Sequence, residues 1–149
     1  MKLRVYLDTS VFSAYYDSRH MDRKIETEQF WSKLNLFEVS TSETAGQELA
    51  QTQNTEQRSS LLKMLESVSI ISVTQPMKQL AQDYVNAGIF TPTMFNDALH
   101  IAAAVLTRQD VLLSWNFKHL VNRRRRAMVN QLNISKSLPG IEIVAPPEI

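Results

Sequence analysis

Three acidic side chains and one amide occupy positions from which they could bind a metal ion. Asp8 directly follows a short hydrophobic run, and Asn116 follows a second one. Glu48 lies late in a short predicted helix, and Asp97 opens an apolar helix of about three turns. In open α/β sheets, ligands bind outside the carboxyl ends of the strands. A carboxylate beside much buried apolar surface must be paired, hydrogen-bonded or metal-bound.

The chemistry that suits these side chains is phosphodiester hydrolysis with a hard cation. The chain contains no cysteine, which excludes thiolate catalysis and Cys-ligated zinc. Carboxylates favour Mg²⁺ or Mn²⁺, and Mg²⁺ combines them with water and substrate phosphate oxygens. Ser10 and Ser114 are predicted to hydrogen-bond the carboxylates or metal-bound water, although both also suit helix caps and strand ends.

Each of these residues also has an ordinary structural interpretation. Asp8 could simply cap the helix that follows, and Asp97 could stabilise its own helix through the helix dipole. Glu48 could be a solvated surface residue, and Asn116 an ordinary N-cap. No single feature decides between the two interpretations. Their combination in one parallel fold favours a functional site.

Two competing assignments remain open. Glu43 is the rival of Glu48, and because it lies five residues earlier, one helix cannot turn both side chains toward the same site. His100 and His119 each follow an acidic or amide residue by three positions, which is a possible zinc spacing. His100, however, lies in the apolar helix, where a hydrogen-bonded core histidine is more common than a ligand.

The second half of the chain carries a basic segment. Between Asp110 and Glu142 there is no acidic residue, whereas six basic residues fall there: Lys118, Arg123, Arg124, Arg125, Arg126 and Lys136. We predict that Lys118 and the arginine run contact a polyanion such as the backbone of an RNA. Pairing of the arginines with acids of the first half is the competing interpretation. Trp115 and Phe117 could stack on a base, although core packing is expected for at least one of them.

The composition is that of an ordinary globular protein. The 149 residues are 44% hydrophobic and 21% charged, which predicts a single domain over residues 1–149. No apolar run reaches the roughly 18 residues of a membrane span, and the first residues lack a signal-peptide pattern. We therefore expect a cytoplasmic protein that does not contact a membrane.

Strands are predicted to alternate with helices along the whole chain. The expected strands are 2–7, 37–40, 68–73, 111–114 and 141–144. The expected helices are 11–16, 22–37, 43–51, 56–67, 77–87, 94–106 and 123–133, with Thr9 or Ser10 capping the first and a capping box between Ser40 and Glu43. This alternation predicts a three-layer α/β/α sandwich with a central, mostly parallel sheet.

Four segments together resemble the PIN-domain family. They are Leu7-Asp8-Thr9-Ser10-Val11, Glu48-Leu49, Asn96-Asp97-Ala98-Leu99-His100-Ile101-Ala102 and Leu113-Ser114-Trp115-Asn116-Phe117-Lys118-His119. The resemblance implies a metal-dependent nuclease whose small bacterial relatives are toxin endoribonucleases of type II toxin–antitoxin pairs. It implies that Asp8, Glu48 and Asp97 bind Mg²⁺ or Mn²⁺, that RNA is the substrate, that an antitoxin protein is a partner, and that the chain forms a homodimer.

The chain departs from this family pattern at Asn116, because the fourth position is commonly an aspartate. An amide oxygen can still bind a hard cation but adds no charge, so a second metal ion would be held more weakly. A catalytically silent PIN-like module that binds RNA or a protein therefore remains the alternative. A phosphotransfer or receiver-like domain that uses Asp8 is disfavoured, because no Asp-x-Asp follows the first strand and no glycine-rich phosphate loop exists.

Overall fold

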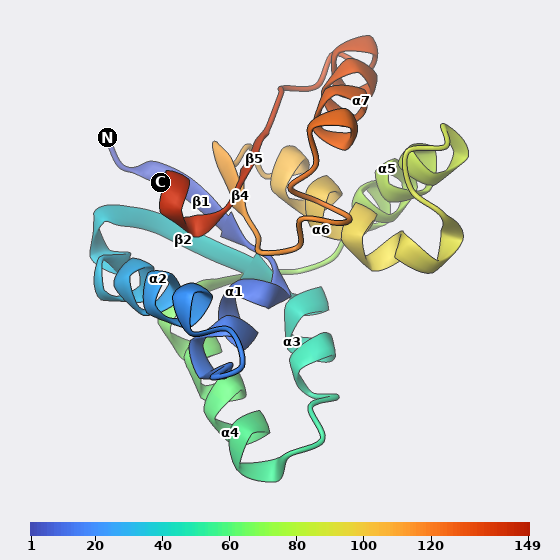
Figure 1. Cartoon of the computed structure of the whole chain (residues 1–149). Helices are drawn as coiled ribbons and strands as arrows, with labels where there is room; N and C mark the ends of the chain where they lie inside the picture. The colour runs from blue at the N-terminus through green and yellow to red at the C-terminus, as the bar shows by residue number, and fades with distance from the viewer.

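The computed structural model describes all residues, 1–149, as a sheet between two layers of helices (Figure 1). The strands are β1 Leu3–Leu7, β2 Phe37–Ser42, β3 Ser69–Ile71, β4 Val111–Leu113 and β5 Glu142–Val144. The helices are α1 Thr9–Ser13, α2 Met21–Ser32, α3 Glu43–Leu49, α4 Thr55–Met64, α5 Gln75–Asn86, α6 Phe95–Leu106 and α7 Arg123–Ser135. The predicted three-layer α/β/α architecture is confirmed.

The five strands form one fully parallel sheet in the order β3-β2-β1-β4-β5. The chain moves outward from β1 through β2 to β3 and then returns to the other side of β1 for β4. In this topology β1 and β4 flank the switch point, where open α/β sheets bind their ligands. Leu7 pairs with Leu113 in register, and the Asp8 amide donates to the Leu113 carbonyl at 3.1 Å. Asp8 and Ser114 therefore leave the sheet side by side.

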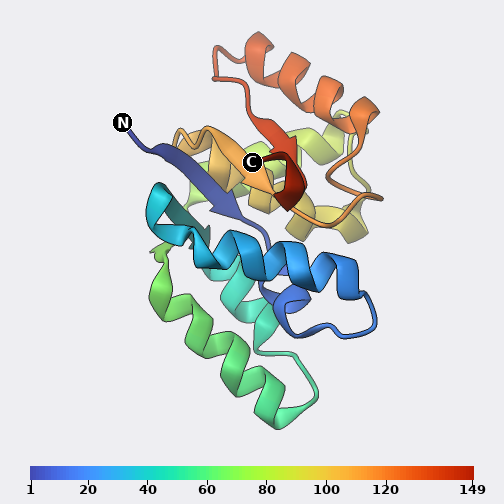
Figure 2. The same cartoon turned by 60° about the vertical axis from the view of Figure 1, so that its left-hand side comes forward.

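Successive side chains of each strand point to opposite faces of the sheet, so the hydrophobic core is divided between the two faces. Tyr6 of β1 and Leu112 of β4 pack against α5, α6 and α7 on one face. Their neighbours Val5 and Leu113 pack against α1, α2 and α4 on the other. Figure 2 shows these two helical layers on either side of the strands. This period of two is what a strand buried on both faces requires.

Helix α6 lies deep in the first of these layers. Every residue from Ala98 to Val105 is buried, as expected for a helix that is apolar nearly all round. Asp97 lies in its first turn, where the sequence placed it. A central, rigid helix thus positions both Asp97 and His100.

Several predicted element ends are wrong. The helix predicted to reach Phe37 stops at Ser32, because Lys33 leaves the helical backbone (φ −109°) and a 3₁₀ turn leads into β2. A similar 3₁₀ turn shortens α4, which ends at Met64. Such tightened turns satisfy the last carbonyls of a helix with i→i+3 bonds and carry no distinct hydrophobic period.

The predicted cap of α1 and the predicted capping box between Ser40 and Glu43 are also wrong. The N-cap of α1 is Asp8 instead of Thr9 or Ser10. Strand β2 continues to Ser42 because its end pairs with β3, so Ser42 caps α3 and no capping box forms at Ser40. The Glu43 carboxylate instead accepts a hydrogen bond from the Val73 amide at 2.6 Å.

No helix in the structure combines the length and the apolar character that crossing a bilayer would require.

Candidate metal centre and its surroundings

Asp8 is buried and held in place by two serines. Its Oδ1 accepts hydrogen bonds from the Ser10 amide (3.1 Å) and the Ser10 hydroxyl (2.5 Å), and its Oδ2 accepts one from the Ser114 hydroxyl at 3.0 Å. The Ser10 hydroxyl also accepts from the Trp115 amide at 2.8 Å, which ties the loop after β1 to the loop after β4. Asp8 therefore caps α1 and is also fixed at the switch point of the sheet.

The carboxylate of Asp8 has neutral hydrogen-bond donors and no cation in direct contact. Burial raises its pKa to about 6, and the nearby charge of Asp97 adds to this rise. The positive charge of His100 and the hydrogen bonds from Ser10 and Ser114 oppose the rise without cancelling it. A buried carboxylate of this kind gains from any cation that binds beside it.

Glu48 and His100 form the second part of the centre. His100 is 1% exposed, and its Nε2 lies 2.7 Å from Glu48 Oε1 while its Nδ1 lies 2.6 Å from the Tyr6 hydroxyl. Thr9 donates its hydroxyl hydrogen to the same Glu48 oxygen at 2.6 Å. The Tyr6 hydroxyl in turn lies 2.8 Å from the Ser42 hydroxyl. One connected hydrogen-bond network thus runs from β2 through α6 and α1 to α3.

The charges around His100 favour its protonated form. Burial alone lowers its pKa, but the hydrogen bond to Glu48 and the negative charges of Asp8, Glu48 and Asp97 outweigh burial and raise it above its usual value. For Glu48, burial raises the pKa, and the bonds from His100 and Thr9 reverse this and lower it. Glu48 and His100 thus favour each other's charged forms.

Asp97 and Asn116 meet at His119. Asp97 Oδ2 lies 2.9 Å from His119 Nδ1, and Asn116 Oδ1 accepts from the His119 amide at 2.9 Å. Asn116 therefore caps the turn that begins at residue 116, as its ordinary structural interpretation predicts. Its amide oxygen retains a second lone pair, and its backbone amide donates to Ser114 at 2.9 Å.

The carboxylates of Asp8, Glu48 and Asp97 thus come to one region of the structure, in which Glu48 is bound to His100 and Asp97 to His119. Glu43 points elsewhere, since its carboxylate is bound to Val73. No three His, Asp or Glu side chains are grouped closely enough to hold a metal ion by themselves. The oxygen-only donor set fits Mg²⁺ or Mn²⁺, because Mg²⁺ is commonly bound by one or two carboxylates completed by water and substrate phosphates.

The arginine run divides into two fixed and two free side chains. Arg125 donates to the carbonyls of Ile89 (2.9 Å) and Lys118 (2.8 Å), and Arg126 donates to the carbonyl of Ile143 at 2.9 Å. Arg123 and Arg124 are exposed, and no residue of the run forms an ion pair. The expected alternative, pairing with acids of the first half of the chain, is therefore absent.

The aromatic residues beside Asn116 have different environments. Trp115 is buried and donates its indole hydrogen to Thr27 at 2.8 Å, whereas Phe117 is 46% exposed. The Arg23 guanidinium lies 5.7 Å from the Trp115 ring centre and 5.3 Å from that of Phe117. Phe117 is thus the aromatic side chain still available to a base, with a cation held beside it.

Sequence reasoning missed several members of this region. Thr9 is predicted only as a cap, and Tyr6 only falls within a predicted strand, yet both contact the His100–Glu48 pair. Arg23 cannot be identified from the sequence, because a single arginine in a charged helix does not indicate a functional role. The His119–Asp97 contact joins residues 22 positions apart, which a single sequence does not reveal.

Several solved structures resemble this fold. A chain of a toxin–antitoxin complex from Klebsiella pneumoniae matches with a TM-score of 0.59 and 19% identity, covering 77% of this chain and 88% of that one. VapC20 from Mycobacterium tuberculosis, described as a sarcin–ricin-loop-cleaving toxin, matches with a TM-score of 0.60 and 17% identity. The match covers 72% of this chain and 86% of that one. A chain of VapBC2 from Rickettsia felis, bound to a promoter DNA fragment, matches with a TM-score of 0.57 and 15% identity. The match covers 95% of this chain and 97% of that one.

No protein-family model and no curated protein matches the sequence. At these identities the similarity to solved structures establishes the fold. The chain has the PIN-like α/β/α fold that the order of its four motifs predicts.

Proposed function

We propose that this protein is a metal-dependent endoribonuclease and the toxin of a toxin–antitoxin pair. The observation that carries the proposal is the arrangement of Asp8, Glu48 and Asp97. These residues come from three distant parts of the chain: Asp8 is buried at the switch point of a parallel sheet, Glu48 bonds the buried His100, and Asp97 contacts His119. Burial lowers the pKa of His100, but the negative charges of all three carboxylates help to raise it, and perturbed pKa values cluster at functional sites.

The structural neighbours support the RNA substrate and the protein partner. VapC20 is described as cleaving the sarcin–ricin loop, and the chains from Klebsiella pneumoniae and Rickettsia felis come from complexes of toxin with antitoxin. We extend both properties to this chain and propose that it also forms a homodimer, as its resemblance to the PIN-domain family implies.

Asp8 and Asp97 are the residues that would hold Mg²⁺ or Mn²⁺, with Glu48 beside them. When bound, the ion would neutralise the charge developing on the phosphate and lower the pKa of a bound water. Ser10 and Ser114 keep the Asp8 carboxylate in one orientation. His100 and Thr9 do the same for Glu48, whose second oxygen carries no hydrogen bond from them. Asn116 contributes an amide oxygen at the margin of the centre.

The test is cleavage of an end-labelled single-stranded RNA by the purified chain. We expect product with Mg²⁺ or Mn²⁺ and none in EDTA, with activity restored when the metal is added back. Cleavage that persists in EDTA would contradict the metal role.

A second function is favoured by the capping role of Asn116. A chain that binds RNA without cutting it would use the same basic surface, and an uncharged fourth position would weaken metal binding. Binding of the labelled RNA without product under any divalent cation would select this alternative.

A further inference from the structure

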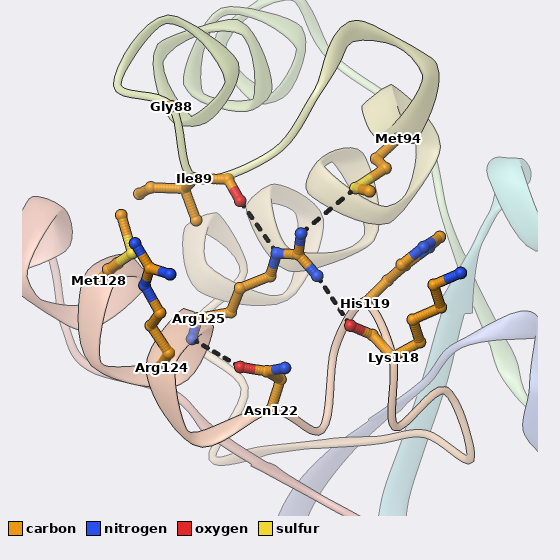
Figure 3. Close-up of a pocket in the computed structure, with 9 residues that line it drawn as sticks. All are labelled: Gly88, Ile89, Met94, Lys118, His119, Asn122, Arg124, Arg125 and Met128. Atoms are coloured by element: carbon orange, nitrogen blue, oxygen red, sulfur yellow. Dashed lines mark hydrogen bonds between the residues drawn. The ribbon is translucent and has the colours of Figure 1, made fainter.

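A polar cavity of about 360 Å³ lies next to the candidate metal centre. It is bounded by the turn that contains Lys118, His119 and Asn122, by the start of α7, and by the segment from Gly88 to Met94 (Figure 3). Its volume falls within the range typical of small-ligand sites. The metal centre proposed above does not include this cavity.

Arg125 holds the walls of the cavity together. Its guanidinium donates to the carbonyls of Ile89 and Lys118, lies 3.6 Å from Met94 Sδ, and lies over the Phe90 ring at 5.2 Å (Figure 3). One side chain thus links α7 to both other walls, so the cavity exists before any ligand binds. A preformed site loses less conformational entropy on binding.

The charge of the cavity is positive and uncompensated. Lys118 and Arg124 line it, both are exposed, and neither forms an ion pair. Arg125 is bound to neutral acceptors, so its charge also remains. No acidic residue lines the cavity. These features favour an anionic ligand such as a phosphate.

Apolar side chains also line the cavity. They are Ile89, Met94 and Met128, and Figure 3 shows Met128 beside Arg124 and Met94 on the other side of Arg125. Flexible thioether side chains adapt to planar, polarizable groups such as aromatic rings. A ligand that carries both a phosphate and a flat ring matches this mixed lining, as a nucleotide does.

His119 connects the cavity to the metal centre. It lines the cavity, and its Nδ1 contacts the Asp97 carboxylate at 2.9 Å. A strand whose phosphodiester lies at Asp97 therefore has its neighbouring nucleotide within reach of the cavity.

We propose that this cavity is a subsite for one nucleotide of the RNA strand, adjacent to the bond at the acidic centre. The positive charges of Lys118 and Arg124 attract the phosphates of the strand on either side of this nucleotide, and the apolar lining contacts its base. This assignment rests on the proposed function for the identity of the strand, but it concerns residues outside the metal centre.

The experiment compares Arg124→Gln with Lys63→Gln. Each substitution removes one exposed basic side chain that forms no ion pair, and Arg124 lines the cavity whereas Lys63 lies on α4, in the opposite helical layer. The probe is a short fluorescent RNA in EDTA, which withholds the metal ion that the proposed cleavage requires. We expect Arg124→Gln to weaken binding about tenfold and to flatten the slope of log affinity against log salt by about 0.7, with much smaller changes for Lys63→Gln. Equal effects of the two substitutions would overturn the subsite.

A second measurement identifies the ligand class. Uridine and adenosine 5′-monophosphates are titrated into ¹⁵N-labelled protein beside inorganic phosphate. We expect the nucleotides to shift the amides of Lys118, Asn122 and Arg124 at concentrations at which phosphate does not. Equal binding of phosphate would contradict a nucleotide subsite. Because neither measurement requires cleavage, an inactive chain that passes both would refute the catalytic proposal and leave the subsite standing.

Discussion

Replacing Asp8 with asparagine is expected to slow RNA cleavage by about a thousandfold or more. The substitution removes the negative charge that a cation needs at the switch point of the sheet. It preserves the shape of the side chain, so Oδ1 still accepts from Ser10, and the new amide group can donate to the Ser114 hydroxyl. Single-turnover cleavage of an end-labelled RNA measures the loss.

The matched control is Asp110→Asn at the opposite end of the sheet. Asp110 Oδ2 accepts from the Arg4 amide at 2.8 Å, a bond that asparagine can also make. This variant should cleave RNA at the wild-type rate. Asp110→Asn should unfold within about 1 kcal/mol of the wild type in urea. Asp8→Asn should be at least as stable as the metal-free wild type, because it removes a buried charge whose pKa burial raises. Comparable cleavage by the two variants would exclude Asp8 from the chemistry.

Replacing His100 with alanine is expected to lower the free energy of unfolding by about 3–5 kcal/mol. The change leaves the Tyr6 hydroxyl and the Glu48 carboxylate without their main partner and opens a cavity beneath α6. Urea denaturation of the metal-free protein gives the difference. His20→Ala is the control, because His20 lies in an exposed turn beside Asp17 and its removal should cost less than about 1 kcal/mol.

The free energies of unfolding of the wild type and His100→Ala should also depend differently on pH. Because the pKa of His100 is higher in the folded protein than in the unfolded chain, its stabilising effect is complete below the unfolded value of about 6.5. This stabilisation is lost as the pH rises through the pKa of His100 in the folded protein. Metal-free wild type should therefore lose stability from about pH 6.5 upward, and His100→Ala should show a flatter profile. A wild-type stability that rises over this range would contradict a protonated His100.

Much of the fold could be predicted from the sequence because the patterns are local. The apolar run of α6 and the β-branched run around Ile70 identify a central helix and a strand without further information. The ends of α2 and α4 could not be predicted, because Leu34 and Leu65 in the 3₁₀ turns continue the apolar spacing of the helices before them. The extension of β2 to Ser42 depends on pairing with β3, which is a tertiary contact.

The candidate site could be predicted in its residue types but not in its connections. Asp8 and Asp97 were identifiable because a carboxylate at the end of a buried strand or at the start of an apolar helix must have a partner. The separate roles of Arg124 and Arg125 were not identifiable. Arg125 is fixed by the carbonyl of Ile89, 36 positions away. Every residue has a backbone carbonyl, so residue types do not show which one accepts this hydrogen bond.

The central claim is that Asp8 and its neighbouring carboxylates bind a divalent cation together with RNA. The most direct test is a Mn²⁺ titration followed by electron paramagnetic resonance, with an RNA phosphonate present to supply phosphate oxygens. In this RNA a methylene group replaces the leaving oxygen, so water cannot cleave the bond. Saturable binding by the wild type that Mg²⁺ displaces and that Asp8→Asn abolishes is the predicted result. Identical Mn²⁺ binding by wild type and Asp8→Asn, or no binding by either, would contradict the claim.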